Sequence, residues 1–372
     1  MTKKEFEKHL ELEFGKAKMD ADKIWKLVTE DLQAPEALLN YQGNPLVFKN
    51  AMIMIQGKTG SHKSRLASAF ASVLISEDPN LSLLGFTKAS QLPVTVLYID
   101  TERNINYQLP IAIRQILLDT GLDLETLKEK FTILPMMNVV RTFRTNVMGR
   151  QFSSLDKKDE KKHYVIFLDI VSDFVSDFNS VTDTFTLTDI LNGATNTFDI
   201  TFIVILHENP GAEKARGHLG TELSNKSSTV FQISETEAPD IVRVKILKSR
   251  NTRKFTEILL KFDESVNNLV IVDDVSVQLM ATDPEMIKLK NVLGRQVFSK
   301  IGRKDLLDFV QKNLDWKERK IEDKLKKMVD LGIRIENIFG TAILKKLRGK
   351  TTEYQFVYLD SENSTEIKDV EK

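Results

Sequence analysis

The chain has 372 residues, of which 41% are hydrophobic and 28% charged, and its 53 Lys and Arg balance its 53 Asp and Glu. This length suits one large α/β domain with smaller appendages better than a single ordinary domain. Because the sequence has no cysteine, no apolar leader and no uninterrupted 18-residue apolar run, it excludes disulfides and thiol catalysis, and we expect a cytoplasmic protein without membrane insertion.

Residues 1–46 are predicted to form a helical N-terminal segment, because "EFEKHLELEF" and "DKIWKLVTEDLQAPEALL" place apolar residues at helical spacing. From residue 47 to about 280, short apolar strands alternate with longer helical segments. The strand candidates are "VFKNAMIMIQ", "TVLYID", "FTILPM", "YVIFLD", "TFIVIL", "STVFQIS" and "IVRVKIL". This alternation predicts an α/β domain whose mostly parallel sheet is flanked by helices and closed by an antiparallel hairpin that turns at Asn267 and Asn268.

Residues 283–360 carry a basic pattern of three helices and a two-stranded ribbon, and residues 361–372 are predicted to be a flexible tail. Residues 286–350 hold 18 Lys or Arg and 8 Asp or Glu, a net charge of +10. The pattern predicts a winged-helix-like domain that binds duplex DNA, with a protein–protein module and a solvated charged face as alternatives. The expected phosphate contacts are Lys317, Arg319, Lys320, Lys324, Lys327, Lys345, Lys346, Arg348 and Lys350.

The segment "MIQGKTGSHKSRLA", residues 54–67, joins a predicted strand to a predicted helix through a glycine-containing turn. Such a loop wraps phosphates with successive backbone N–H groups at a helix N-terminus. Lys63 is placed to reach the β- and γ-phosphates, and the Ser64 hydroxyl is placed to coordinate Mg²⁺. The residues predicted to bind ATP are Gly57, Lys58, Thr59, Gly60, Ser61, His62, Lys63, Ser64 and Arg65.

His62 stands where this motif has its second glycine. A glycine there lets the backbone approach the phosphate without obstruction by a side chain. A histidine permits binding when its ring points outward, so we expect ATP to bind and leave the rate of hydrolysis open.

Polar residues also follow three other predicted strands, which should meet at one edge of the sheet. Glu102 is predicted to be the base that activates the attacking water, and Asp169 to hold Mg²⁺ together with Ser64. His207 is predicted to sense the γ-phosphate. Asp100 and Asp173 are alternatives to Glu102, and each of these side chains could instead be a helix cap or a loop residue.

The order of these motifs resembles that of RecA-like ATPases, and most of all the RepA branch of hexameric replicative helicases, with the DnaB and RadA/KaiC groups as relatives. The likeness spans about residues 48–275. It implies a RecA-like core, ATP and Mg²⁺, and a homo-oligomeric, hexameric ring with its sites between subunits. It also implies Glu102 as catalytic base and Asp169 as the Walker B aspartate.

The segment "LKSRNTR" is similar to a DnaB-type element whose basic residues reach the neighbouring subunit's γ-phosphate, which implies that role for Lys248 and Arg250. Single-stranded DNA would pass through the ring, near Lys214, Arg216 and His218. In a departure from the RepA pattern, Glu208 replaces the second histidine after the sensor strand.

These observations favour an ATP-dependent, DNA-acting P-loop ATPase, specifically a RepA-like replicative helicase of a plasmid or mobile genetic element. Two alternatives stay open: an ATP-binding, DNA-binding regulator with slow or no hydrolysis, and a RecA-like recombination ATPase that does not unwind DNA.

Overall fold

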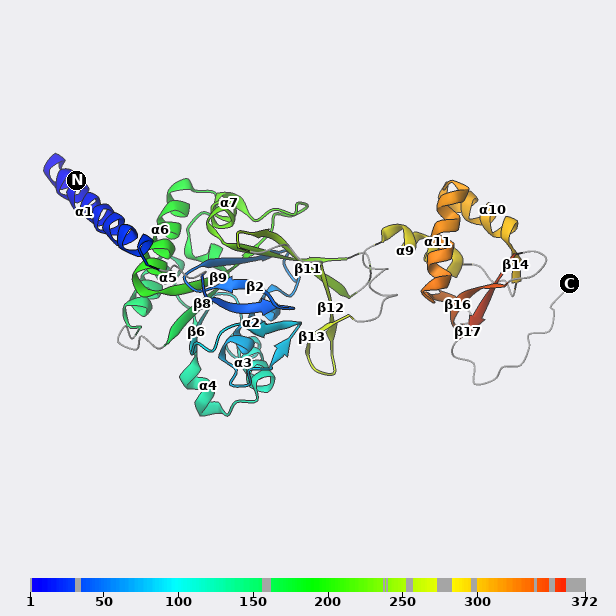
Figure 1. Ribbon diagram of the computed structural model, residues 1–372, viewed down its shortest axis with the longest axis horizontal. Helices are drawn as coiled ribbons and strands as arrows, with labels where there is room; N and C mark the ends of the chain where they lie inside the picture. The colour runs from blue at the N-terminus through cyan, green and yellow to red at the C-terminus, as the bar shows by residue number, and fades with distance from the viewer. Residues whose placement is uncertain are drawn as a thin grey trace.

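The computed structural model describes residues 2–30, 35–155, 162–236, 238, 240–251, 257–272, 283–295, 300–337, 340–347 and 352–358. The predicted fold class is confirmed: a large, mostly parallel sheet is flanked by helices (Figure 1). In this part of the chain, no helix is long and apolar enough to cross a membrane.

Within the described residues, the central sheet has nine strands in the order β13-β12-β11-β10-β3-β9-β8-β6-β7. Its parallel strands are β3 (Met52–Gly57), β6 (Val94–Asp100), β7 (Phe131–Pro135), β8 (His163–Asp169), β9 (Ile200–His207) and β10 (Thr229–Glu235). The antiparallel extension is formed by β11 (Ile241–Ser249), β12 (Ile258–Asp263) and β13 (Asn268–Ile271). The predicted antiparallel closure is therefore confirmed.

Two hydrophobic clusters cover the two faces of this sheet, because successive strand residues point to opposite sides. Ile53 and Ile55 of β3 belong to one cluster, and Met52 and Met54 belong to the other. The first cluster includes residues of α2 (Lys63–Ile75), α3 (Gln108–Thr120) and α4 (Leu124–Lys130). The second includes residues of α5 (Arg141–Ser153), the 3-10 helix η1 (Val171–Phe174), α6 (Val181–Phe198) and α7 (Gly217–Lys226).

The helical prediction for residues 1–46 is correct only for its first part. Helix α1 (Lys3–Val28) is present, and none of its residues is buried. Residues after it form β1 (Ala37–Tyr41) and β2 (Asn44–Phe48), which lie in a small antiparallel sheet with β5 (Phe86–Lys88) and β4 (Ser82–Leu83). The hairpin arises because Gln42 and Gly43 take φ of 46° and 79°, as a tight two-residue turn requires.

The strand candidate "VFKNAMIMIQ" was also too long. Val47 and Phe48 end β2, and β3 begins only at Met52. Asn50 between them has φ of 53°, a left-handed conformation that ends one strand before the next begins.

Residues after 282 form α9 (Pro284–Gly294), β14 (Lys300–Gly302), α10 (Arg303–Leu314), α11 (Glu318–Asp330), β15 (Arg334–Asn337), β16 (Gly340–Leu347) and β17 (Glu353–Tyr358). The predicted ribbon corresponds to β16 and β17, and β14 and β15 flank it in a sheet of order β14-β17-β16-β15. A separate hydrophobic cluster joins these helices and strands, which are drawn in yellow to red in Figure 1. Arg348, Lys350 and the predicted tail, residues 361–372, lie outside the described residues.

Candidate functional site

The predicted site residues lie together at the edge of the sheet that is formed by the carboxyl ends of the parallel strands. Gly57 at the end of β3 is the register partner of His207 on β9, and Asp100 on β6 is the register partner of Asp169 on β8. Because β9 lies between β3 and β8, the loop after β3 and Asp169 flank the same strand. This edge is where ligands of open α/β sheets bind.

Gly57 lets the phosphate-loop strand pass close to its neighbour. A Cβ at this position would lie 2.3 Å from the Ile233 carbonyl oxygen and 2.6 Å from Ser61 Oγ. The loop then bends through Gly60, whose φ of 84° suits glycine, before α2 begins at Lys63. The His62 side chain makes no capping hydrogen bond in the described structure, so the first N–H groups of α2 are left for an anion.

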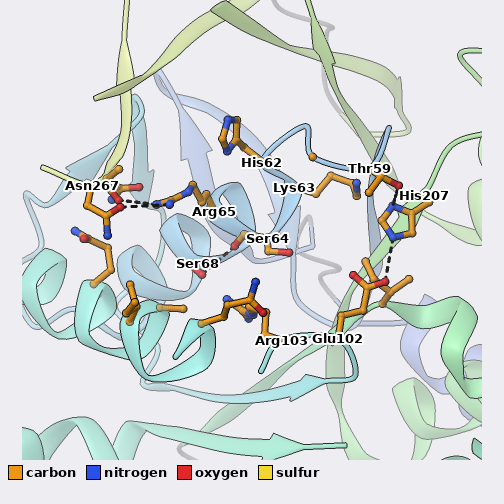
Figure 2. Close-up of a pocket in the computed structure, with 17 residues that line it drawn as sticks. Thr59, His62, Lys63, Ser64, Arg65, Ser68, Glu102, Arg103, His207 and Asn267 are labelled. Carbon is orange, nitrogen blue, oxygen red and sulfur yellow. Dashed lines mark hydrogen bonds and ion pairs between the residues drawn. The ribbon is translucent and has the colours of Figure 1, made fainter. Parts of the chain in front are cut away.

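His62 accommodates the missing glycine by its conformation. Its φ is 66°, in the left-handed region that glycine adopts most easily. Its ring stacks on Phe262 with 5.8 Å between ring centroids and 10° between the planes. Figure 2 shows the ring pointing away from Ser64. The side chain therefore leaves the inside of the loop clear.

Lys63 is buried with its ammonium group turned back on the loop. Its Nζ donates to the Lys58 carbonyl oxygen at 2.6 Å, and Ser61 Oγ donates to the same oxygen at 2.8 Å. Burial lowers the pKa of Lys63 to about 8, while the nearby charges of Asp169, Glu102 and Glu208 oppose that shift. Phosphate groups at the loop would supply the compensating negative charge.

Asp169 is buried beside two groups that hold its carboxylate. Tyr98 Oη donates to Asp169 Oδ2 at 2.8 Å, and the Arg103 guanidinium lies 3.5 Å from the same oxygen. Burial raises the pKa of Asp169, and its hydrogen bond with Ser64 counteracts this.

A hydroxyl next to a carboxylate is a donor set that fits Mg²⁺. In the described chain, no group of three or more His, Cys, Asp or Glu could hold a metal, so Ser64 and Asp169 would hold the ion together with phosphate oxygens.

Glu102 and His207 form a pair beside the loop (Figure 2). His207 Nε2 lies 3.2 Å from Glu102 Oε1, and His207 Nδ1 lies 3.5 Å from the Thr59 hydroxyl. The hydrogen bond with His207 lowers the pKa of Glu102, against the opposing effect of burial. Glu102 is thus kept as a carboxylate, the form a base needs.

The two carboxylates that were alternatives to Glu102 as the base are both paired with arginines. Asp100 accepts from the backbone N–H of Arg103 at 2.7 Å and pairs with its guanidinium at 2.5 Å. Asp173 pairs with Arg141 and Arg144, each at 2.9 Å, which ties η1 to α5. Glu102, whose side chain is 50% exposed, is the carboxylate of the three that faces the cavity.

A cavity of about 440 Å³ runs along the start of α2, a volume in the usual range for small-molecule sites. Lys63, Ser64, Glu102 and His207 line one end of it. The residues that line the other end were not predicted from the sequence, apart from Arg65. They are Arg65, Gln115, Asn267 and Asn268, and the unpredicted Gln108 and Ile111 also line the cavity. No local sequence motif identifies the amide side chains among them as site residues. Arg103 also lines the cavity, and it could have been predicted because it directly follows Glu102.

Lys248 and Arg250 lie away from this cavity. Lys248 Nζ donates to the carbonyl oxygens of Ser224 and Asn225 at 2.7 and 2.8 Å, and Arg250 donates to that of Asn225 at 2.5 Å. Both cations therefore cap the C-terminal end of α7 in this chain. Neither is among the described residues that line the cavity.

Glu208, the departure from the RepA pattern, is buried beneath the edge of the sheet. Its Oε1 accepts from Gln56 Nε2 on β3 and Gln232 Nε2 on β10, both at 2.7 Å. Glu208, which directly follows β9, is therefore bonded to both β3 and β10. Glu208 does not line the cavity, and its role in this structure is to hold neighbouring strands together.

The basic side chains of α11 divide into two groups. Lys320 pairs with Glu285, and Lys324 pairs with Asp283 at 2.6 Å, so two of the expected phosphate contacts bind the start of α9 instead. Lys317, Arg319 and Lys327 are exposed.

In the loop after β9, the Arg216 guanidinium lies 4.3 Å from the ring centroid of Phe178.

No family model and no curated protein matches this sequence. Among solved structures, the chain is similar to the crystal structure of the RadB recombinase, with 13% identity, a TM-score of 0.44, and coverage of 62% of this chain and 94% of that one. It is also similar to the solved structure of another protein's ATPase domain, with 12% identity, a TM-score of 0.45, and coverage of 61% of this chain and 86% of that one.

Proposed function

We propose that this chain is an ATP-dependent, DNA-acting P-loop ATPase that uses Mg²⁺. The observation that carries the proposal is the convergence of Glu102, Asp169 and His207, from three neighbouring strands, on the loop that holds Lys63 and Ser64. A phosphate loop by itself recurs in many binding proteins, whereas hydrolysis also needs a group beside the loop that deprotonates or orients the attacking water.

In the proposed reaction, Lys63 neutralises the β- and γ-phosphates, and the N-terminus of α2 adds partial positive charge. Ser64 and Asp169 would hold Mg²⁺, which when bound would supply further charge compensation on the phosphate oxygens. Glu102 accepts a proton from a water molecule whose oxygen attacks the γ-phosphorus. The bond from the γ-phosphorus to the bridging oxygen breaks, and its electron pair leaves with ADP.

The DNA contact is proposed for the C-terminal unit. Lys317, Arg319 and Lys327 form an exposed basic group on and just before α11, and phosphate contacts by such residues dominate DNA affinity. We propose that this unit is a winged-helix domain for duplex DNA, that residues 47–280 form the ATPase domain, and that residues 1–46 and 361–372 are appendages.

In its most specific form, the proposal is a cytoplasmic RepA-like replicative helicase of a mobile genetic element. It would assemble as a homo-oligomeric, hexameric ring around single-stranded DNA. Lys248 and Arg250 would then leave the end of α7 to reach the neighbouring subunit's γ-phosphate, where a cation stabilises charge in the transition state.

The test is ATP turnover with and without single-stranded DNA, for the wild type, Lys63→Ala and Glu102→Gln. DNA-stimulated turnover that both substitutions abolish is the expected result. Lys128→Ala and Glu125→Gln on α4 are matched controls, because both side chains are well exposed and lie outside the cavity. Unwinding of a forked duplex separates a helicase from a recombination ATPase.

An ATP-binding, DNA-binding regulator is the second candidate. The contacts that favour it are the turned-back Lys63 ammonium and the pairing of Glu102 with His207, which both occupy groups that hydrolysis needs. Tight ATP binding with negligible turnover in the presence of DNA would support the regulator and contradict the motor.

A further inference from the structure

Phosphates bound beside Lys63 would fill only one end of the cavity, and the other end would face a different part of the ligand. The cavity continues from Lys63 along α2 to Arg65, and is closed there by α3 and the turn between β12 and β13. Figure 2 shows Arg65 pointing toward Asn267, on the side opposite Glu102 and His207. A nucleotide whose γ-phosphate lies near Glu102 would therefore extend its nucleoside toward Arg65.

The planar guanidinium of Arg65 is held in a fixed position at this end of the cavity. Its Nη1 donates to the Asn267 carbonyl oxygen at 2.5 Å, and its guanidinium carbon lies 4.4 Å from the ring centroid of Phe262. Asn267 takes φ of 50°, a left-handed conformation that asparagine tolerates better than most residues. A guanidinium fixed in this way can stack on an aromatic base, because its plane is delocalised and weakly hydrated.

Asp119 orients the amides beside Arg65. Its Oδ1 accepts from Gln115 Nε2 at 2.8 Å, and both of its oxygens lie 3.4 Å from Asn268 Nδ2. Ser72 Oγ lies 3.5 Å from Asp119 Oδ2. Burial raises the pKa of Asp119, while these neutral donors oppose the shift. The carboxylate thus fixes which way the two amides face.

This orientation gives the cavity a hydrogen-bonding preference. The bond to Asp119 uses one N–H of the Gln115 amino group and leaves its carbonyl Oε1, with the second N–H beside it, for a ligand. Asn268 also turns its amino group toward Asp119, and its Oδ1 accepts from the Leu269 N–H at 2.8 Å. An acceptor at this end favours a base with an exocyclic amino group over one with an oxo group.

We propose that Arg65 and Gln115 form a base-recognition end that selects adenosine nucleotides, with the base stacked on Arg65 and its 6-amino group donating to Gln115 Oε1. Asp119 is a positioning residue, because it acts through Gln115 and Asn268. Hypoxanthine and guanine place a 6-oxo acceptor against Gln115 Oε1, so they bind less tightly. This inference rests on the proposed phosphate site and adds the residues that recognise the base.

The test is equilibrium binding of ADP, IDP and GDP with Mg²⁺, which avoids hydrolysis, together with tripolyphosphate as a probe without a base. The wild type is expected to bind ADP about tenfold more tightly than IDP or GDP, the effect of one hydrogen bond with an unpaired alternative. Gln115→Ala should remove this preference and leave tripolyphosphate affinity unchanged. Arg65→Lys should weaken ADP and IDP alike. Gln311→Ala on α10, an exposed amide outside the cavity, is the control.

Asp119 is tested by comparing two substitutions. Asp119→Asn keeps an oxygen that can accept from Gln115 and should retain most of the preference for ADP, whereas Asp119→Ala should lose it. Because each variant is also measured with tripolyphosphate, a general loss of folding is distinguished from a loss of base selection.

Equal wild-type affinity for ADP and IDP, or an unchanged ratio in Gln115→Ala, would overturn the base assignment. If tripolyphosphate still binds in a manner that Lys63→Ala abolishes, the phosphate site survives and only this inference fails. If neither ADP nor tripolyphosphate binds the wild type, the proposed function fails with it.

Discussion

His207 Nε2 lies 3.2 Å from Glu102 Oε1, and the other ring nitrogen of His207 lies 3.5 Å from the Thr59 hydroxyl. One imidazole therefore joins the end of β9, the carboxylate after β6 and the phosphate loop after β3. In the described structure, the ring is therefore a direct link between the loop and Glu102.

Replacing His207 should shift the pH dependence of turnover. The hydrogen bond from His207 lowers the pKa of Glu102, and a base must be deprotonated to act. In His207→Ala the pKa of Glu102 rises, so the acidic limb of the pH–rate profile moves to higher pH. Turnover should also fall roughly 10- to 100-fold, because Glu102 loses the hydrogen bond that orients it. An acidic limb at the same pH as in the wild type would show that His207 does not act through Glu102.

Nucleotide affinity should fall as pH rises above about 8. Burial lowers the pKa of Lys63 to about 8, and bound phosphates would raise it. Above pH 8, binding must therefore take up a proton, and each further pH unit weakens affinity by up to about tenfold until the pKa of the complex is reached. Calorimetry of ADP binding in two buffers of different ionisation enthalpy measures this uptake. Lys63→Ala should show none at pH 8–9.

His62 should tolerate glycine better than alanine. Glycine relieves the left-handed backbone, worth about 1–2 kcal/mol, and offsets the lost stacking on Phe262, worth roughly 1 kcal/mol. Alanine loses the stacking and keeps the strain. In chemical denaturation, His62→Ala is expected to be less stable than His62→Gly by about 1 kcal/mol, with ADP binding retained in both. Loss of binding in His62→Gly would mean that the ring contacts the nucleotide.

Gly57→Ala should destabilise the protein by roughly 2–3 kcal/mol, because the new methyl group would lie 2.3 Å from the Ile233 carbonyl oxygen. Gly149→Ala in α5 is the matched control. A Cβ there meets nothing within 4 Å among the described atoms, so the same change should stabilise the helix by about 0.5–1 kcal/mol. Thermal denaturation of the two variants should therefore shift in opposite directions, and a tolerated Gly57→Ala would contradict the close approach of β3 and β10.

The two groups of cations on α11 should respond differently to substitution. Arg319→Ala and Lys327→Ala remove exposed charges, so each should weaken duplex DNA binding and reduce the slope of affinity against salt by about 1, with little change in stability. Lys324→Ala breaks a partly buried pair with Asp283 and should lower the melting temperature. Unchanged DNA affinity after deletion of residues 283–372 would remove the DNA-binding proposal for this unit.

Much of the site was predictable because its signals are local. The glycine turn, Lys63 and Ser64 lie within one short segment, and the residues that end β6, β8 and β9 follow apolar runs that are visible in the sequence. The parallel sheet then follows from the length and composition of those runs. Residues 37–46 were predicted wrongly because their apolar spacing also fits a helix, and only the turn at Gln42 and Gly43 separates the two strands.

The sequence by itself determined that a glycine-containing loop, a carboxylate and an imidazole each follow an apolar strand of an α/β sheet, since each depends on a few consecutive residues. Only the tertiary structure decided that Asp100 and Asp173 are held by arginines and that Glu102 is left facing the cavity. It also brought Asp119 to Asn268, which are 149 residues apart in the chain. Such pairs follow from the order of strands and the packing of α3 against α2, and local sequence carries no record of either.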